Sequence, residues 1–142
     1  MFATFRRFVS AAVLGAAVLV APGASANVTP TLFSITPEAG AFRWTYSVSL
    51  DADQDVLPGN FFTIFDFTGY VPGSHLQPVG WSFSSSLVGV TPPLTLPADD
   101  PAVPNLTWTR TGPSIAGTAA RGVFSARSPQ DLVKVGNFAG RA

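Results

Sequence analysis

Prolines and glycines interrupt this chain at intervals too short for α-helices of ordinary length. The chain contains 13 residues of each type, and after the first 26 residues 12 prolines and 11 glycines are still to come. Proline removes a backbone N–H and clashes with the preceding helical turn, and glycine inside a helix is costly in entropy. The chain therefore has to fold from short strands and turns, and we expect an all-β protein.

The first 26 residues have the organisation of a secretory signal peptide. Arg6 and Arg7 precede an apolar stretch at residues 9–20, and Ala-Ser-Ala at residues 24–26 is a small-residue cleavage site. The apolar stretch is shorter than the roughly 20 residues that span a bilayer. We expect residues 1–26 to be removed during export, so that the mature chain begins at Asn27 and resides at the cell surface or outside the cell.

The mature chain, residues 27–142, has the length of a single domain, since 142 − 26 leaves 116 residues. Two of the eight basic residues leave with the signal peptide and all eight acidic residues stay, so its formal charge is 6 − 8 = −2. This balance gives no basic surface for nucleic acid or for an anionic membrane. With no cysteine, the domain has to be stabilised by packing without disulfides.

Strict alternation of apolar and polar side chains marks residues 42–50 as the clearest strand, with an apolar face running from Phe42 through Trp44 to Leu50. Residues 57–69 are apolar at odd and even positions, which is typical of a central strand covered on both faces. Further short strands are expected at residues 79–84, 87–91, 106–110, 122–128 and 133–142, with a proline-rich surface connection at residues 91–105. About seven short strands at this spacing predict an antiparallel β-sandwich, immunoglobulin-like or jelly-roll-like.

One acidic turn has the spacing of a metal site. Asp51, Asp53 and Asp55 alternate with other residues, and three carboxylates so placed are able to hold Ca²⁺. The glycine and glutamate that an EF-hand loop requires later in its sequence are replaced by Val56 and Phe62. A solvated turn is the favoured interpretation, and the three aspartates are the calcium candidates if a cofactor exists.

Catalytic groups are sparse. Asp66 has no partner carboxylate or base in the sequence and is interpreted as a turn residue, and His75 is the only histidine. We therefore expect a structural or interaction role rather than enzymatic activity. Tyr70, Trp81 and Trp108 are the candidates for stacking on sugar rings, so a carbohydrate-binding module is the alternative function.

Several motifs in a fixed order resemble bacterial exported proteins of the PEP-CTERM sorting class. They are Phe-Arg-Trp-Thr-Tyr-Ser-Val at 42–48, Pro-Gly-Asn-Phe-Phe-Thr-Ile at 58–64 with Asp-Phe at 66–67, Gly-Trp-Ser-Phe at 80–83, Asp-Pro at 100–101 and Pro-Asn-Leu-Thr-Trp-Thr at 104–109. The resemblance implies export by a Gram-negative bacterium to the envelope or extracellular matrix. It implies exopolysaccharide or other envelope proteins as partners, and it supplies no established catalytic residues to carry over to this chain.

The end of the sequence departs from that family. Its members continue to a Val-Pro-Glu-Pro sorting signal, an apolar helix and a basic tail, whereas this sequence stops at Ala142. Either the reading frame is truncated or this protein is released rather than sorted. A chain that ends within the strand expected at 133–142 leaves a sheet edge open, so we expect self-association through this last strand.

Overall fold

The computed structural model describes residues 28–50, 54–116, 122–134 and 136–142, so the expected signal peptide lies outside the described residues. The all-β prediction is confirmed. Within these ranges no helix has the length and apolar character needed to cross a membrane. The strands are β1 (Val28–Glu38), β2 (Ala41–Leu50), β3 (Phe61–Ile64), β4 (Trp81–Ser86), β5 (Asn105–Arg110), β6 (Val123–Ser128) and β7 (Phe138–Arg141).

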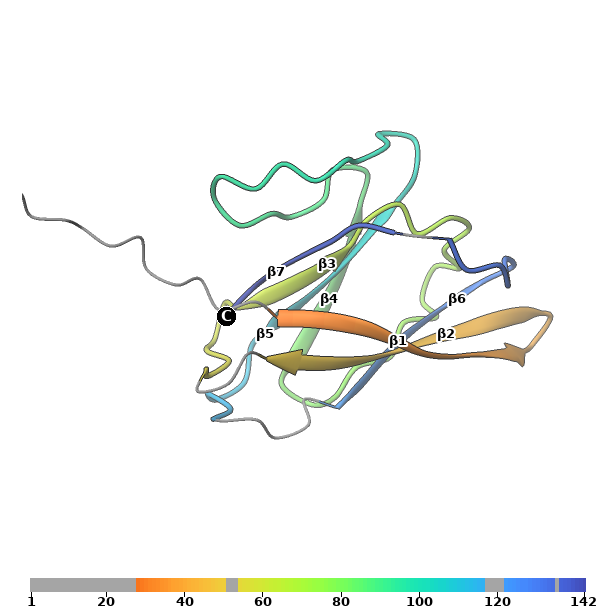
Figure 1. The fold of residues 1–142 in the computed structure, drawn as a ribbon. Helices are drawn as coiled ribbons and strands as arrows, with labels where there is room; N and C mark the ends of the chain where they lie inside the picture. Colours follow the sequence, from red (N-terminus) through yellow and green to blue (C-terminus); the bar gives the residue numbers. More distant parts are fainter. Residues whose placement is uncertain (1–27, 51–53, 117–121, 135) are drawn as a thin grey trace, which may run out of the picture.

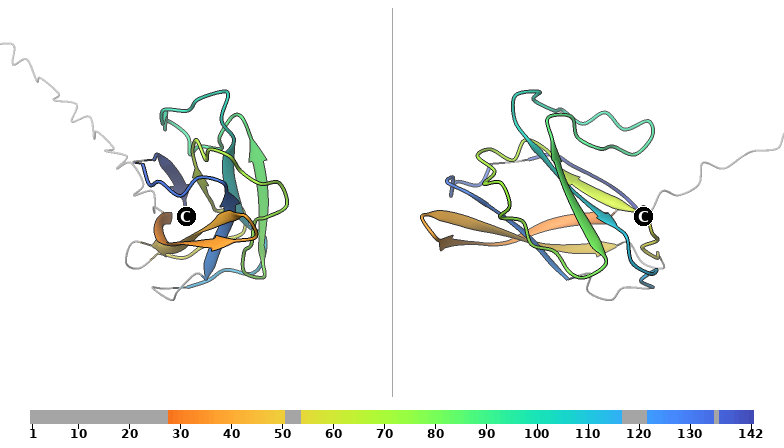
Figure 2. Two further views of the ribbon diagram at one scale, coloured as in Figure 1. Left: turned by 90° about the vertical axis from the view of Figure 1, so that its right-hand side faces the viewer. Right: turned by 180° about the vertical axis from the view of Figure 1, so that it is seen from behind.

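The strands form two antiparallel sheets, and the predicted β-sandwich is confirmed. One sheet has the order β1-β2-β6 and the other the order β4-β5-β3-β7. The left view of Figure 2 shows the orange β1–β2 hairpin in one layer and the green β4 at the far side of the other. In a constant-type immunoglobulin domain the second strand lies between the first and the fifth. Here its second neighbour is β6, so the strand order is a different one.

The expected strands need correction at three places. The last strand is shorter than the expected 133–142, because among its described residues only Phe138–Arg141 is a strand. Residues 28–38 form a strand that the sequence pattern did not indicate, because Pro30 and Pro37 argue against a strand and are tolerated only at a sheet edge, where β1 lies. Residues 87–91 form no strand. The backbone N–H of Gly89 donates to Asp99 Oδ2 at 3.1 Å instead of to a neighbouring strand.

The core lies between the sheets and is mainly aromatic. Phe62 on β3 stacks on Trp108 of β5 with 5.2 Å between ring centroids, and Phe124 of β6 meets it edge-on at 4.9 Å. Trp81 also contacts Phe124 edge-on at 4.9 Å. Offset and edge-to-face pairs of this kind stabilise a core beyond the area that they bury. The central position expected for the aromatic stretch is confirmed, although only residues 61–64 of it are extended as a strand.

The proline-rich connection between β4 and β5 lies against the outer face of the second sheet, as the teal segment at the top of Figure 1. The Thr63 hydroxyl of β3 donates to the carbonyl oxygen of Val90 at 2.8 Å and accepts from the hydroxyl of Thr107 at 2.8 Å. Both threonines are buried although they point away from the aromatic core. The expected surface connection is thus also the cover of this sheet.

The last strand is an edge strand, as predicted, but part of its edge is occupied. Ala139 is buried, and a Cβ on Gly140 would lie 2.2 Å from the carbonyl oxygen of Val28 at the start of β1. Any side chain at position 140 would overlap this carbonyl oxygen, so the close approach of β7 and β1 requires glycine. The start of β1 therefore covers the C-terminal half of this edge, while self-association through the last strand stays a prediction.

Candidate functional site

A cavity of about 540 Å³ opens at one end of the sandwich. The right side of Figure 1 shows the β1–β2 hairpin and the dark-blue segment between β6 and β7 at this end, and the right view of Figure 2 shows both from behind. Three stretches far apart in the sequence form the walls. The described lining residues are Trp44, Tyr46, Ile64, Phe65, Asp66, Phe67, Thr68, Ser128, Gln130, Leu132, Val133, Lys134, Gly136 and Asn137.

Trp44 is the aromatic side chain that connects the cavity to the core. It belongs to the apolar face of β2, as its alternation predicts, and it is half-buried. Its ring meets Phe67 edge-on at 6.0 Å, and its Nε1 donates to the carbonyl oxygen of Gln130 at 2.8 Å. Trp44 therefore holds the segment after β6 across the mouth of the cavity.

Asp66 lies in the cavity wall with a backbone φ of 54°, in the left-handed region. Its N–H donates to Asn105 Oδ1 at 2.9 Å, and its Oδ1 accepts from the backbone N–H of Asp100 at 2.8 Å. The side-chain amide of Asn105 donates in turn to Asp99 Oδ1 at 2.8 Å. Asp66 thus ends the extended segment as predicted, and it also ties the proline-rich connection to β3.

Two of the three predicted sugar-stacking residues are wrong. Trp108 is fully buried and Trp81 is 6% exposed, so both rings belong to the core and present no face to a sugar. Alternation along a strand indicates which side chains share a face but not whether that face is covered.

Tyr70 is the third candidate, and it is half-buried. Its hydroxyl pairs with His75 Nδ1 at 3.0 Å, and the histidine ring stacks on Phe83 at 3.9 Å. Burial raises the pKa of Tyr70, and the backbone N–H of Gly73 acts in the opposite direction. His75 is therefore held in place by neighbouring aromatic rings.

The structure does not test the three aspartates that are the calcium candidates. Asp51 and Asp53 lie outside the described residues, and Asp55 lies just before the isolated bridge between Val56 and Ile115. Among the residues that the structure does describe, no three His, Cys, Asp or Glu side chains are grouped to hold a metal ion. The calcium site stays a prediction.

No protein-family model, curated protein or solved structure matches this chain. The chain is a small antiparallel β-sandwich, and the cavity at its end has the size of a small-ligand site. The resemblance to PEP-CTERM proteins therefore enters below as a proposal.

Proposed function

We propose that this chain is a non-enzymatic, exported interaction domain of a bacterial envelope or extracellular matrix, and that it binds its ligand in the cavity beside Trp44. The signal-peptide pattern of residues 1–26 and the PEP-CTERM-like motifs support the location. Other envelope proteins and exopolysaccharide are the partners that this location offers.

The observation that carries the binding role is the cavity itself. Its volume of about 540 Å³ is within the range of small-ligand sites, roughly 300 to 1,000 Å³. Its wall is mainly apolar, with a few polar groups such as Asp66, Lys134 and Asn137. A mainly apolar pocket with a small number of polar groups is the common composition of binding sites, because apolar area gives affinity and polar groups fix orientation.

The distribution of acidic side chains favours binding over hydrolysis. Among the described residues that line the cavity, Asp66 is the only acidic one. Glycoside hydrolysis generally needs two carboxyl groups about 5 to 9 Å apart, one of them as acid and the other as nucleophile or base. Asp66 already accepts the backbone N–H of Asp100 and acts as a structural tie.

Carbohydrate binding is the second candidate function, now at a different place from the one predicted. Trp44 and Phe67 contribute ring surface to the cavity, and Lys134 and Asn137 are hydrogen-bond donors in the same wall. Aromatic rings beside polar groups are able to receive the apolar face and the hydroxyl groups of a sugar ring together.

Tryptophan fluorescence tests the cavity directly. Of the three tryptophans only Trp44 lines it, while Trp81 and Trp108 report on the core. Titrating the mature chain with neutral and acidic oligosaccharides and with an anilinonaphthalene sulfonate dye should change the Trp44 emission at saturating ligand. The change should disappear in Trp44→Phe.

Two exposed valines provide a matched pair of variants. Val133 lines the cavity and is 66% exposed, whereas Val123 is 57% exposed and does not line it. Each substitution to aspartate adds the same charge at little cost in stability. Because only Val133→Asp places that charge in the cavity, it should weaken binding, whereas Val123→Asp should leave binding unchanged. Equal effects of the two substitutions, or no fluorescence change with any of these ligands, would contradict the proposed binding site.

A further inference from the structure

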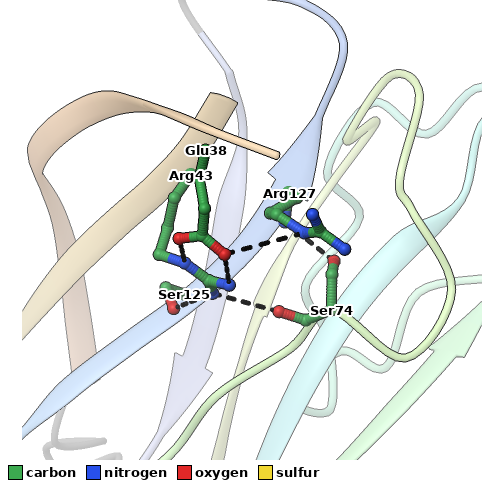
Figure 3. Close-up of polar contacts among 5 residues, drawn as sticks. All are labelled: Glu38, Arg43, Ser74, Ser125 and Arg127. Carbon is green, nitrogen blue, oxygen red and sulfur yellow. Dashed lines mark hydrogen bonds and ion pairs between the residues drawn. The ribbon is translucent and has the colours of Figure 1, made fainter. Parts of the chain in front are cut away.

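A cluster of charged side chains lies on the outer face of the β1-β2-β6 sheet, away from the cavity. Glu38 ends β1, while Arg43 of β2 is the direct cross-strand partner of Arg127 of β6. Figure 3 shows these three side chains with Ser74 and Ser125. Like charges directly opposite each other on a sheet repel, so this pairing needs compensation.

Arg43 receives that compensation in full. Its Nε and Nη2 donate to the two carboxylate oxygens of Glu38, and its Nη1 donates to Ser125 Oγ at 2.8 Å and to the carbonyl oxygen of Ser74 at 3.1 Å. The hydrogen bond from Arg43 lowers the pKa of Glu38, and the same contact raises the pKa of Arg43. The single carboxylate of the cluster is thus engaged by one of its two arginines.

Arg127 is left with a much weaker contact. Its Nε lies 3.9 Å from Glu38 Oε1, beyond hydrogen-bond distance, and this buried nitrogen finds no hydrogen-bond acceptor in the described chain. Figure 3 shows its two terminal nitrogens pointing away from Glu38 and Arg43. The Arg127 side chain is 23% exposed although its Nε is buried, so a ligand is able to reach its two terminal nitrogens. The one buried and unsatisfied donor, Nε, is destabilising until an acceptor is supplied.

The surroundings define what kind of molecule brings that acceptor. Ser34, Thr36, Thr45 and Ser47 are on the same outward face, as the strand register and the inward-pointing Tyr46 establish. These side chains offer hydroxyl groups on β1 and β2. The exposed apolar side chains beside β6, Leu76 and Val123, are too few to form the apolar centre that a protein partner needs in its interface. Two arginines against one glutamate leave one positive charge, 2 − 1, for an anionic ligand.

We propose that Arg127 binds the carboxylate of a polyhydroxylated ligand, a sugar acid, on the outer face of the β1-β2-β6 sheet. The planar guanidinium fork matches two carboxylate oxygens, which a lysine ammonium does not. The neighbouring serine and threonine hydroxyls exchange hydrogen bonds with the hydroxyl groups of the sugar. This site is separate from the cavity, so the proposal does not depend on ligand binding in the cavity.

Nuclear magnetic resonance titration of the mature chain with glucuronate tests the proposal, with glucose, phosphate and hexaglutamate as comparison ligands at constant ionic strength. Glucuronate should shift the Arg127 Nε–H resonance in a saturable way. Arg127→Gln should raise the Kd about tenfold or more, the loss of one charge-assisted interaction. Arg127→Lys should also weaken binding, because it keeps the charge and loses the fork.

Arg141→Gln is the matched control, since it removes an exposed arginine from β7 on the other sheet. It should leave the Kd unchanged. The proposal is overturned if glucose, phosphate or hexaglutamate binds as tightly as glucuronate, or if Arg127→Gln binds like the native chain. It is also overturned if glucuronate binds only to Glu38→Gln, because Arg127 would then serve only as a second partner of Glu38.

Discussion

Truncating Trp108 to alanine should destabilise this domain far more than the same change at Trp44. Trp108 is fully buried between the sheets, stacked on Phe62 and edge-on to Phe83 and Phe124 at 5.2 and 5.9 Å. Trp44 is half-buried at the rim of the cavity. The sequence places both on apolar strand faces, so only the observed burial separates them.

The expected magnitudes follow from the buried area. A buried tryptophan removes about 150 to 250 Å² from water, which at about 25 cal/mol per Å² corresponds to about 4 to 6 kcal/mol. Since alanine keeps part of this and the site relaxes, Trp108→Ala should cost about 3 to 5 kcal/mol. Trp44→Ala loses about half of this, about 1.5 to 2.5 kcal/mol, and one solvent-exposed hydrogen bond worth about 0.5 kcal/mol, so about 2 to 3 kcal/mol in total. A domain of this size has roughly 6 to 17 kcal/mol of stability in all.

Urea unfolding of the mature chain, followed by far-ultraviolet circular dichroism, measures both differences. Trp108→Phe, expected to cost less because it keeps a ring in the core, provides a measurable variant if Trp108→Ala does not fold. The m-values should stay equal, which would show that the unfolded states are comparable. Equal losses for the two alanine variants would refute the assignment of Trp108 to the core and Trp44 to the rim.

Three further predictions concern the contacts that hold the sandwich together. Gly140→Ala should cost about 1 to 3 kcal/mol, because its Cβ would meet the Val28 carbonyl oxygen, and thermal unfolding measures the loss. Asn105→Ala should cost about 1 to 3 kcal/mol and expose the proline-rich connection to limited proteolysis; unchanged cleavage would contradict its anchoring role. Arg43 lowers the pKa of Glu38 in the folded chain. The ion pair therefore stabilises the fold at pH values above the pKa of Glu38 in the unfolded chain, and this stabilisation is lost as the pH falls through the pKa of Glu38 in the folded chain. Glu38→Gln should therefore flatten the acid side of the stability profile, and an unchanged slope would count against the ion pair.

The tertiary structure corrected the sequence analysis where burial and edges decide the outcome. Trp81 and Trp108 have the spacing of an exposed aromatic platform as much as of a core face, and only the opposing sheet decides between them. Residues 28–38 were missed because their prolines are acceptable only at an edge, and edge position is a property of the assembled sheet.

The candidate sites are even harder to predict from the sequence than the strands. The cavity joins β2, the segment after β3 and the segment after β6, and no local pattern indicates that these lie together. Arg127 appears in the sequence as an ordinary polar residue of a strand. Its pairing opposite Arg43, and the engagement of Glu38 by that neighbour, result from the register between β2 and β6.

The sequence alone determined that this protein is built from short strands, since its prolines and glycines leave no room for helices and its side chains alternate with period two. These are local steric and hydrophobic properties, and they belong to the chain before it folds. The tertiary structure alone decided which aromatic residues are covered, which sheet edge is partly covered and which of two neighbouring arginines Glu38 engages. Each of these depends on which strands become neighbours, because burial and hydrogen-bond partners are set by contacts between residues distant in the sequence.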